Sequence, residues 1–328
     1  MNVAVTGASG FVGGYLVDEL VHRGHRVNAL VRRPMGRGLW GDGPLTARGD
    51  EATEPVAYAT LDLTDPTSVE DCLSRVRPDA VVHCAAQASV RRSWESPGLT
   101  FETNAAGTAN LLQALKGRVG RLVLVGSAQQ YAPCPPGHRL RETDAMRADS
   151  PYALSKIAQE ELGMMYGQAF GLEVVATRSF NHTGPGQSEE YAVGSFCSQI
   201  ARIEAGLAGR QLRVGNLDAE RDFCDVRDVV AAYAGLLESG VAGEAYNVCR
   251  GEGTVIRDVL ERLLNLAGLK SFVEVVEGER RPGGDREALV GNSSKIKELL
   301  DWTPRIPLDT SLADTLGWYR GRIMARLT

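Results

Sequence analysis

The sequence predicts an α/β protein, with a doubly wound parallel sheet and a smaller α/β lobe built mainly from the C-terminal part of the chain. Short apolar runs alternate with amphipathic segments through the first half of the 328 residues. Repetition of strand, helix and strand is typical of a parallel sheet with helices on both faces. After about residue 178 the alternation stops, and Gly and Pro cluster at 184–186 and 281–284. This change indicates a second lobe, for which the chain is long enough.

Each element follows from the spacing of its apolar residues. Short apolar runs predict strands, and apolar residues three and four positions apart predict helices. The expected strands are 2–5, 26–31, a run ending at 61–63, 80–83, 122–126 and 173–177. The expected helices are 13–23, 67–75, 104–115, 152–170 and 255–266. Thr254 is the expected N-cap of the last helix. Ligands of such sheets bind outside the carboxyl ends of the strands, where the candidate residues are sought.

The composition excludes several classes of protein. The chain has 36 basic and 41 acidic residues, and this balance argues against a nucleic-acid-binding surface, for which a basic stripe is typical. No apolar run approaches the roughly 18 residues needed to span a membrane. The six cysteines are scattered without a CxxC pair, and no signal peptide precedes the first strand. We therefore expect reduced thiols, no metal site and a cytoplasmic protein.

A glycine-rich turn joins the first expected strand to the first expected helix. Gly7, Gly10 and Gly13 form a GxxGxxG pattern. In Rossmann dinucleotide-binding domains such glycines allow a tight turn, close approach of the pyrophosphate and close packing of the helix on the sheet. Free N–H groups at the start of the helix then face the phosphates. The flanking strand and helix therefore predict a dinucleotide site, which Phe11 and Val12 also border.

The residues after the second strand indicate which dinucleotide binds. An acidic side chain at this place would bind the ribose 2′-hydroxyl of NAD. Here Arg32 and Arg33 follow the strand, and the next acidic residue is Asp42. Two guanidinium groups suit a 2′-phosphate, so the sequence predicts NADP, with NAD less favoured. The alternative is a solvated pair of arginines.

Two further strand ends are expected to border the cofactor. Asp62 and Leu63 end the third apolar run, where they can meet the adenine. Ala85, Ala86 and Gln87 follow the fourth strand. Small side chains at that place let the cofactor cross the edge of the sheet.

Three residues form a candidate catalytic set. Tyr152 and Lys156 are four residues apart, so they share one face of a helix. A phenol with a pKa near ~10 is a poor acid–base catalyst at neutral pH, and a nearby ammonium lowers that pKa. Ser127 follows an apolar strand at its carboxyl end, where it can hydrogen-bond a substrate oxygen. Because a YxxxK spacing is common on helices, the prediction depends on Ser127 as well.

The glycine turn together with Ser127, Tyr152 and Lys156 resembles the extended short-chain dehydrogenase/reductase family, and the resemblance covers nearly the whole chain. Later segments are similar to the members that reduce GDP-linked 4-keto-6-deoxy sugars, and these segments are 178–187, 214–217, 221–228, 246–249 and 302–308. The run from Asn181 to Gln187 is the most specific of them.

The resemblance implies a mechanism. NADPH delivers a hydride to C4 of a 4-keto sugar, and Tyr152 protonates the resulting oxyanion. Ser127 positions and polarises the carbonyl, while Lys156 tunes Tyr152 and binds the nicotinamide ribose. Asn104 matches the family's helix asparagine, which we assign to the cofactor site, although it can serve the fold alone.

The resemblance also implies a site for a sugar nucleotide. The expected substrate residues are Ser89, Arg91, Gln129, Asn181, Val214, Arg221 and Arg281. Arg221 and Arg281 match diphosphate-binding arginines, and Val214 is expected to border the base. The chain departs from the family pattern at Gly284, where an acid is expected. The GDP moiety is implied by the resemblance alone.

Gln129 narrows the expected chemistry. Relatives that dehydrate sugars carry a carboxylate two residues after the catalytic Ser or Thr, and an amide cannot transfer a proton in that role. Dehydration is therefore disfavoured, whereas a nucleotide-sugar 4-epimerase with tightly bound NAD stays open as the alternative. A dinucleotide sensor without catalysis is a further alternative, against which the presence of Tyr152 and Lys156 argues.

The organisation of the chain follows from the same reasoning. Residues 1–177 with about 217–249 are expected to form the NADP-binding Rossmann domain. Residues from about 178 to 216, with 250–328, are expected to form the sugar-nucleotide-binding lobe. The resemblance also implies a homodimer that pairs through the helices near 104–115 and 152–170.

Overall fold

The computed structural model describes residues 1–33, 56–278 and 286–327, and the structural statements below refer to these residues. Its larger part is a seven-stranded sheet with the strand order β10-β6-β5-β4-β1-β2-β3. All neighbouring strands in it are parallel. The strands are β1 (Asn2–Thr6), β2 (Arg26–Val31), β3 (Val56–Thr60), β4 (Ala80–His83), β5 (Arg121–Ser127), β6 (Glu173–Ser179) and β10 (Ala245–Val248).

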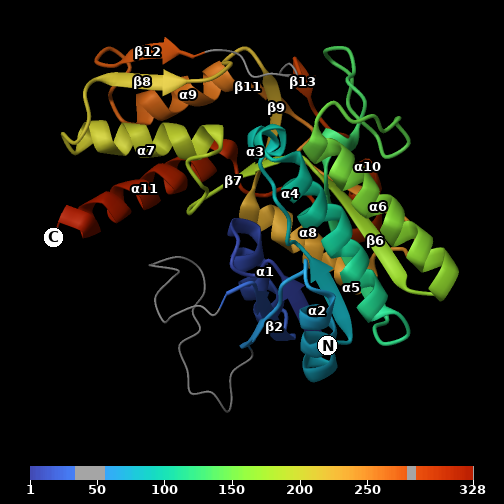
Figure 1. Cartoon of the computed structure of the whole chain (residues 1–328). Helices are drawn as coiled ribbons and strands as arrows, with labels where there is room; N and C mark the ends of the chain where they lie inside the picture. The colour runs from blue at the N-terminus through green and yellow to red at the C-terminus, as the bar shows by residue number, and fades with distance from the viewer. Residues whose placement is uncertain (34–55, 279–285, 328) are drawn as a thin grey trace.

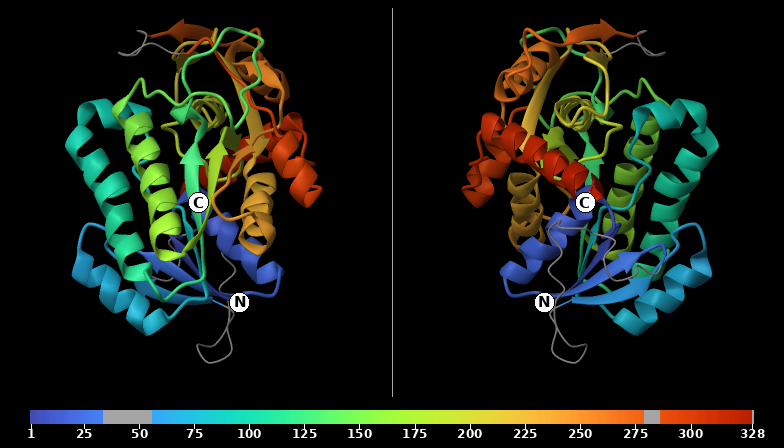
Figure 2. Two further views of the ribbon diagram at one scale, coloured as in Figure 1. Left: turned by 90° about the vertical axis from the view of Figure 1, so that its right-hand side faces the viewer. Right: turned by 90° about the vertical axis from the view of Figure 1, so that its left-hand side faces the viewer.

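Helices cover both faces of this sheet, as Figure 2 shows edge-on. The covering helices are α1 (Phe11–His22) and α8 (Val226–Ser239) on one face, and α2 (Pro66–Val76), α5 (Gly107–Leu115) and α6 (Pro151–Phe170) on the other. Successive side chains of a strand point to opposite faces. Val3 and Val5 accordingly pack with α1 and α8, whereas Ala4 packs with α2 and α5. Burial on both faces explains why the central strands are almost continuously apolar.

A smaller lobe lies beyond the carboxyl ends of the large sheet, at the top of Figure 1. In it β9 (Glu220–Asp225) pairs with β7 (Asn181–Thr183), β11 (Gly253–Val255) and β13 (Ala288–Leu289). A second small sheet joins β8 (Gln211–Val214) to β12 (Glu274–Glu277). The helices α7 (Ala192–Glu204), α9 (Ile256–Leu266) and α11 (Leu308–Leu327) bury their apolar faces in a separate core. The short helix α10 (Ser294–Leu300) contacts β10.

The fold class predicted from the sequence is confirmed, and most element boundaries agree to within two residues. The helix expected over 104–115 differs, because the chain forms α3 (Val90–Glu95), α4 (Pro97–Phe101) and a wide π-type turn, Glu102–Ala106, before α5 begins. Thr254 was expected to cap α9, but it lies in β11 opposite Arg221 of β9. Because Thr254 is part of a β-strand, Val255 takes the N-cap position, and α9 begins without a side-chain cap.

The chain passes between the two parts of the molecule at a place that differs from the expected one. A return to the large sheet was expected at about 217, yet β9 still pairs within the small lobe. The first element back on the large sheet is α8, which Asp225 caps by accepting a hydrogen bond from Arg227 N. The crossing therefore falls at the junction of β9 and α8.

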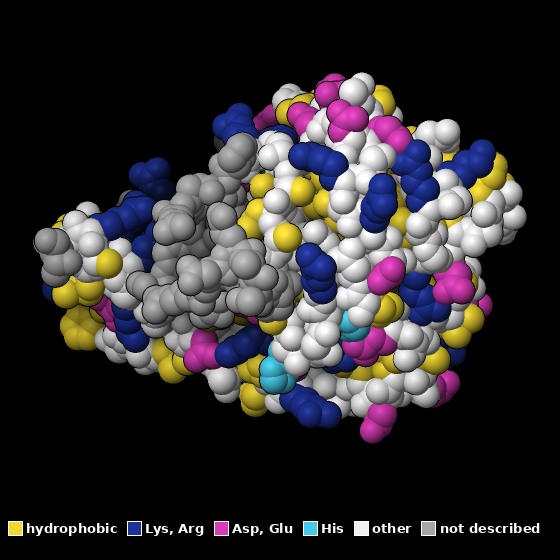
Figure 3. All heavy atoms as spheres, turned by 90° about the horizontal axis from the view of Figure 1, so that it is seen from below, with side chains coloured by type: hydrophobic (Ala, Val, Ile, Leu, Met, Phe, Trp, Pro, Cys, Tyr) yellow, Lys and Arg dark blue, Asp and Glu magenta, His cyan; other side chains and the backbone are white. Residues whose placement is uncertain are grey.

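The charge distribution on the surface, the character of the helices and the state of the cysteines complete the description. Basic and acidic side chains are interspersed on the described part of the face seen from below (Figure 3). Within the described ranges, no helix combines the length and the apolar character that a membrane crossing requires. The six cysteines are unpaired.

Candidate active site

The glycine turn after β1 is built so that only glycine fits. Gly7 has a φ of +67°, and a Cβ there would lie 2.8 Å from the Ala85 backbone. A Cβ on Gly13 would overlap the carbonyl oxygen of Gly7. Gly10 N donates to that same oxygen at 2.8 Å and caps α1 without a side-chain hydrogen bond. The N–H groups of the first turn are therefore left for a ligand, and the turn fits the pyrophosphate of a dinucleotide.

The segment after β4 lies directly against this turn. Ala85 and Ala86 are small and half-buried. Gln87 N donates to Asn104 Oδ1 at 2.7 Å, and Asn104 Nδ2 donates to Gln87 O and to Ser155 Oγ. Asn104 is fully buried, and both of its N–H donors are used within the protein. It therefore holds the expected cofactor loop against the helix that carries Tyr152, rather than offering its amide to a ligand.

His83, at the end of β4, is a buried neutral side chain. Thr108 Oγ1 donates to Asn104 O, so it can only accept from His83 Nε2 at 3.0 Å. The proton therefore lies on Nε2, and Nδ1 accepts from Thr6 Oγ1 at 2.7 Å. Burial, with a contribution from Lys156, lowers the pKa of His83 to about 3.

The residues expected at the adenosine end of the cofactor lie close together. Arg32 and Arg33 are exposed after β2. Asp62 accepts two hydrogen bonds from Thr64, at 3.0 Å and 2.8 Å. These bonds, with a smaller contribution from Arg32, lower the pKa of the Asp62 carboxyl. Leu63 is buried beside them. Arg32 is therefore within electrostatic reach of Asp62.

Ser127 and Tyr152 meet at the carboxyl end of β5. Ser150 caps α6 by accepting a hydrogen bond from Ala153 N at 3.1 Å, and Pro151 begins the helix. This start directs Tyr152 inward, where only 8% of it is exposed. Burial raises the pKa of Tyr152, while its hydrogen bond with the Ser127 side chain opposes the rise.

Lys156 lies one turn further along α6 and is also buried. Its Nζ donates to Val125 O and to Gln159 Oε1, each at 2.6 Å. Burial lowers the pKa of Lys156 to about 8. That Lys156 lowers the pKa of Tyr152 stays a prediction. The pKa of Tyr152 is raised because burial outweighs the Ser127 hydrogen bond.

Gln129 is held from two sides. Its N–H donates to Ser127 Oγ at 3.2 Å, and its carbonyl accepts from Arg286 Nη2 at 2.9 Å. Arg286 also donates to Asp149 Oδ2 at 2.6 Å, and its carbonyl accepts from Arg221 Nη1 at 2.9 Å. The candidate diphosphate residue Arg221 is thus connected to the Ser127 turn through Arg286, which the sequence did not single out.

The other expected substrate residues have different surroundings. Ser89 caps α3, and Arg91 is exposed and paired with Glu95 at 3.8 Å. Asn181 is half-buried in β7. Val214 was expected to border the base, but its side chain is in the core of the small lobe and only 6% exposed. The alternation of β8 turns it inward, so that expectation is corrected. The expected diphosphate residue Arg281 lies outside the described residues.

The small lobe adds aromatic groups that sequence reasoning missed. Tyr191, which precedes α7 and is 39% exposed, lies near Tyr152. Partial burial, and then the proximity of Tyr152, raise the pKa of Tyr191. Phe11 stacks on His182 with 6.2 Å between ring centres. These contacts join the small lobe to α6 and to the glycine turn. No spacing rule marks them, because they are made between distant parts of the chain.

Several known proteins are similar to this chain over nearly its whole length. The family described as GDP-mannose 4,6 dehydratase matches residues 4–315. GDP-6-deoxy-D-mannose reductase of Pseudomonas aeruginosa is 34% identical over 323 residues, which is 97% of each chain. A structure of RMD from Pseudomonas aeruginosa complexed with NADPH matches with a TM-score of 0.81 and 33% identity, over 98% of this chain and 99% of that one. UDP-glucose 4-epimerase of Thermus thermophilus in complex with NAD matches with a TM-score of 0.84 and 34% identity, over the same shares.

The geometry of the glycine turn predicts the effect of a single methyl group. Gly13→Ala should weaken binding of a nicotinamide dinucleotide, tested with NADPH, at least about tenfold, because the Cβ forces Gly7 and the phosphate-facing turn apart. Gly98→Ala is the control, since a Cβ there meets no atom within 4 Å. Fluorescence titration of bound NADPH measures the dissociation constant. Equal affinities for the two variants would contradict this reading of the turn.

The buried neutral His83 predicts an acid-sensitive stability. Its folded pKa of about 3 lies below the ordinary 6.5, so the unfolded chain binds more protons below pH 6.5, and stability falls as the pH falls. Between pH 7 and pH 5 the wild type should lose about 2 kcal/mol more unfolding free energy than His83→Gln. Urea unfolding at both pH values measures this difference, with exposed His22→Gln as the control. Parallel losses in the wild type and His83→Gln would contradict the assignment.

Proposed function

Because this chain belongs to the GDP-mannose 4,6-dehydratase family, among the extended short-chain dehydrogenases/reductases, we propose that it reduces the C4 ketone of a nucleotide-linked 4-keto-6-deoxy sugar with NADPH. The specific reaction that we propose is GDP-4-keto-6-deoxy-D-mannose to GDP-D-rhamnose. The 34% identity to a GDP-6-deoxy-D-mannose reductase over nearly the whole chain supports it.

The observation that carries the proposal is the position of Tyr152, which is buried beside Ser127 at the carboxyl end of β5. A phenol carries its proton at neutral pH, and Tyr152 is placed so that it can donate that proton. Reduction of a ketone requires such an acid at the oxygen that becomes a hydroxyl. Gln129 stands where a dehydratase needs a carboxylate, and its amide transfers no proton. The site is therefore equipped for protonation at C4 and lacks this acid–base group for loss of water.

The residues divide the work of the reaction. NADPH, when bound at the glycine turn, supplies the hydride. Ser127 Oγ orients and polarises the C4 carbonyl, and Tyr152 donates its proton to the C4 oxygen. Lys156, held by Val125 O and Gln159, is the proposed partner of the nicotinamide ribose. Its lowered pKa of about 8 permits it to restore a proton to Tyr152.

NADP rather than NAD is the proposed cofactor, although relatives bind either one. Arg32 and Arg33 leave β2 exposed, and Arg32 lies within electrostatic reach of Asp62. A 2′-phosphate would give these guanidinium groups a partner that accepts paired hydrogen bonds. The absence of an acidic residue directly after β2 supports the same choice.

The small lobe is the proposed site of the sugar nucleotide. We assign Arg221 and Arg281 to the diphosphate, Asn181 and Gln129 to the sugar, and Ser89 with Arg91 to the loop that flanks it. We also propose a cytoplasmic homodimer. Exposed apolar side chains of α6 support it, namely Leu154, Met165 and Phe170.

A nucleotide-sugar 4-epimerase with tightly bound NAD is the second candidate. The 34% identity to the Thermus thermophilus epimerase, which was solved with NAD, favours it. Epimerases retain their cofactor through the cycle, whereas reductases exchange it. The absorbance of bound cofactor in the purified protein therefore separates the two candidates.

The wild type should oxidise NADPH when GDP-4-keto-6-deoxy-D-mannose is added. Tyr152→Phe should lower kcat by about a hundredfold or more, because the proton donor is lost. Tyr166→Phe on the same helix is the control, because its hydroxyl bonds only the exposed Gln113. Absorbance of NADPH and NMR of the sugar give the readout. Retained NAD with interconversion of C4 epimers and no NADPH oxidation would refute the reductase and favour the epimerase.

The double variant Arg32→Ala, Arg33→Ala should raise KM for NADPH by about tenfold to a hundredfold, because charge-assisted hydrogen bonds to the 2′-phosphate are lost. KM for NADH should change less than about twofold. Exposed Arg26→Ala, at the other end of β2, is the matched control. An equal rise for both cofactors would contradict the role of these arginines.

A further inference from the structure

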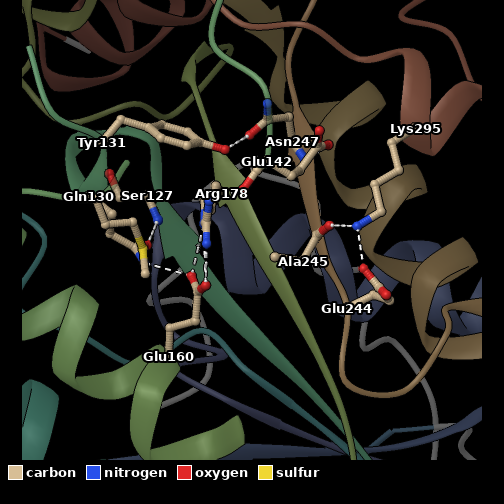
Figure 4. Close-up of polar contacts among 11 residues, drawn as sticks. Ser127, Gln130, Tyr131, Glu142, Glu160, Arg178, Glu244, Ala245, Asn247 and Lys295 are labelled. Atoms are coloured by element: carbon tan, nitrogen blue, oxygen red, sulfur yellow. Dashed lines mark hydrogen bonds and ion pairs between the residues drawn. The ribbon is translucent and has the colours of Figure 1, made fainter. Parts of the chain in front are cut away.

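A buried polar network lies directly behind Ser127, and Gln130 is at its centre (Figure 4). Gln130 is completely buried. Its Oε1 accepts a hydrogen bond from Ser127 N at 2.7 Å, and its Nε2 donates to Glu160 Oε2 at 2.6 Å. Gly126 makes room for this amide, because a Cβ there would collide with Gln130 Oε1. Both ends of one side chain thus bridge the Ser127 backbone and a buried carboxylate.

That carboxylate is itself fixed. Glu160 forms an ion pair with Arg178, whose Nη2 lies 2.7 Å from Glu160 Oε1, and the two side chains are only 6% and 7% exposed. Arg178 also donates to Glu142 O at 2.9 Å. A buried ion pair tolerates little displacement, since either charge without its partner costs several kcal/mol. Glu160 is therefore held in a fixed position, and Gln130 is hydrogen-bonded to it.

Glu160 lies on α6, the helix that also carries Tyr152 and Lys156. Tyr152, Lys156 and Glu160 follow one another at four-residue spacing, so they share one face of the helix. Gln130 therefore connects the backbone of Ser127, at the end of β5, to the helix that carries the other two catalytic residues. The separation of Ser127 Oγ from the Tyr152 hydroxyl depends on how these two elements are aligned. Gln130 links them through Ser127 N and Glu160, and Lys156 Nζ, which donates to Val125 O, links them at a second place.

We propose that Gln130 is a positioning residue of the active site: it aligns Ser127 with Tyr152 by holding the Ser127 N–H against the Glu160–Arg178 pair. This inference rests on the proposed function only for its kinetic test. Gln130 is completely buried, so we assign it an effect on the reacting carbonyl through Ser127 and not through a contact with a ligand.

Gln130→Met keeps the length of the side chain and removes both hydrogen bonds. It should lower kcat about tenfold while KM for the sugar nucleotide and the affinity for NADPH stay within about twofold. Tyr131→Phe is the matched control, because it removes a buried hydroxyl that bonds Asn247 at 2.6 Å and contacts Arg178, and it leaves the Gln130 bonds to Ser127 N and Glu160 in place. An equal fall in kcat for both variants would overturn the proposal, since it would reflect general loosening of the core.

A double-mutant cycle with Ser127→Ala shows whether Gln130 acts through the serine. Adding Gln130→Met to Ser127→Ala should cause no more than about a twofold further loss of kcat, because the group that Gln130 aligns is already gone. Independent multiplication of the two losses would overturn the proposal, because separate structural effects add in free energy.

Gln130→Glu provides a pH signature. The introduced carboxyl and Glu160 can share a hydrogen bond only while one of them is protonated. The pH profile of kcat for Gln130→Glu should therefore show a decrease with rising pH that the wild-type profile lacks. A profile identical in shape to that of the wild type would count against the alignment role.

Hydrogen exchange tests the link without any turnover. Gln130→Met should speed deuterium uptake at the Ser127 amide at least about tenfold, whereas Tyr131→Phe should leave it unchanged. Unaltered uptake in Gln130→Met would overturn the proposal. If the proposed function fails, the wild type shows no reduction of 4-keto sugars, and the exchange result still decides the role of Gln130.

Discussion

The Glu160–Arg178 ion pair is the interaction on which the proposed alignment of Ser127 with Tyr152 depends. It joins α6 to β6 in the interior of the large sheet, with both side chains almost completely buried. Burial of two charges is costly unless every lone pair and proton finds a partner. Here Glu160 accepts from Arg178 and Gln130, and Arg178 also bonds the carbonyl of Glu142. The demand for complete pairing fixes the helix that carries Tyr152 and Lys156 relative to the strand that ends at Ser127.

The burial of Tyr152 and Lys156 determines their pKa values, and so the chemistry that we propose for the site. It raises the pKa of Tyr152 and lowers that of Lys156, so a neutral phenol lies near an amine that loses its proton readily. This combination suits delivery of a proton to an oxygen that gains negative charge. The family scaffold serves reductases, epimerases and dehydratases alike, so the distinction depends on a few side chains. Gln129 argues against dehydration, and the two arginines after β2 support the proposed choice of NADP.

The sequence predicted the large sheet and the glycine turn because both follow local rules. Apolar runs mark buried parallel strands, and close backbone approach leaves only glycine at positions 7 and 13. The missed features are all tertiary. Thr254 has a side chain that can cap a helix, yet it lies in β11 and pairs with β9. Burial of Tyr152 depends on how distant parts of the chain pack together. The same is true of the contacts that Arg286 and Tyr191 make near the candidate catalytic residues, and no local sequence pattern indicates them.

The most direct test of the account is the fate of the transferred hydrogen. The protein is incubated with NADPH that carries deuterium at both hydrogen positions of the nicotinamide C4 and with GDP-4-keto-6-deoxy-D-mannose, and the product is analysed by NMR and mass spectrometry. The account predicts one deuterium at C4 of the sugar and oxidised NADP in equal amount. A product without deuterium at C4, or with solvent hydrogen exchanged at C5 and the cofactor unchanged, would contradict it.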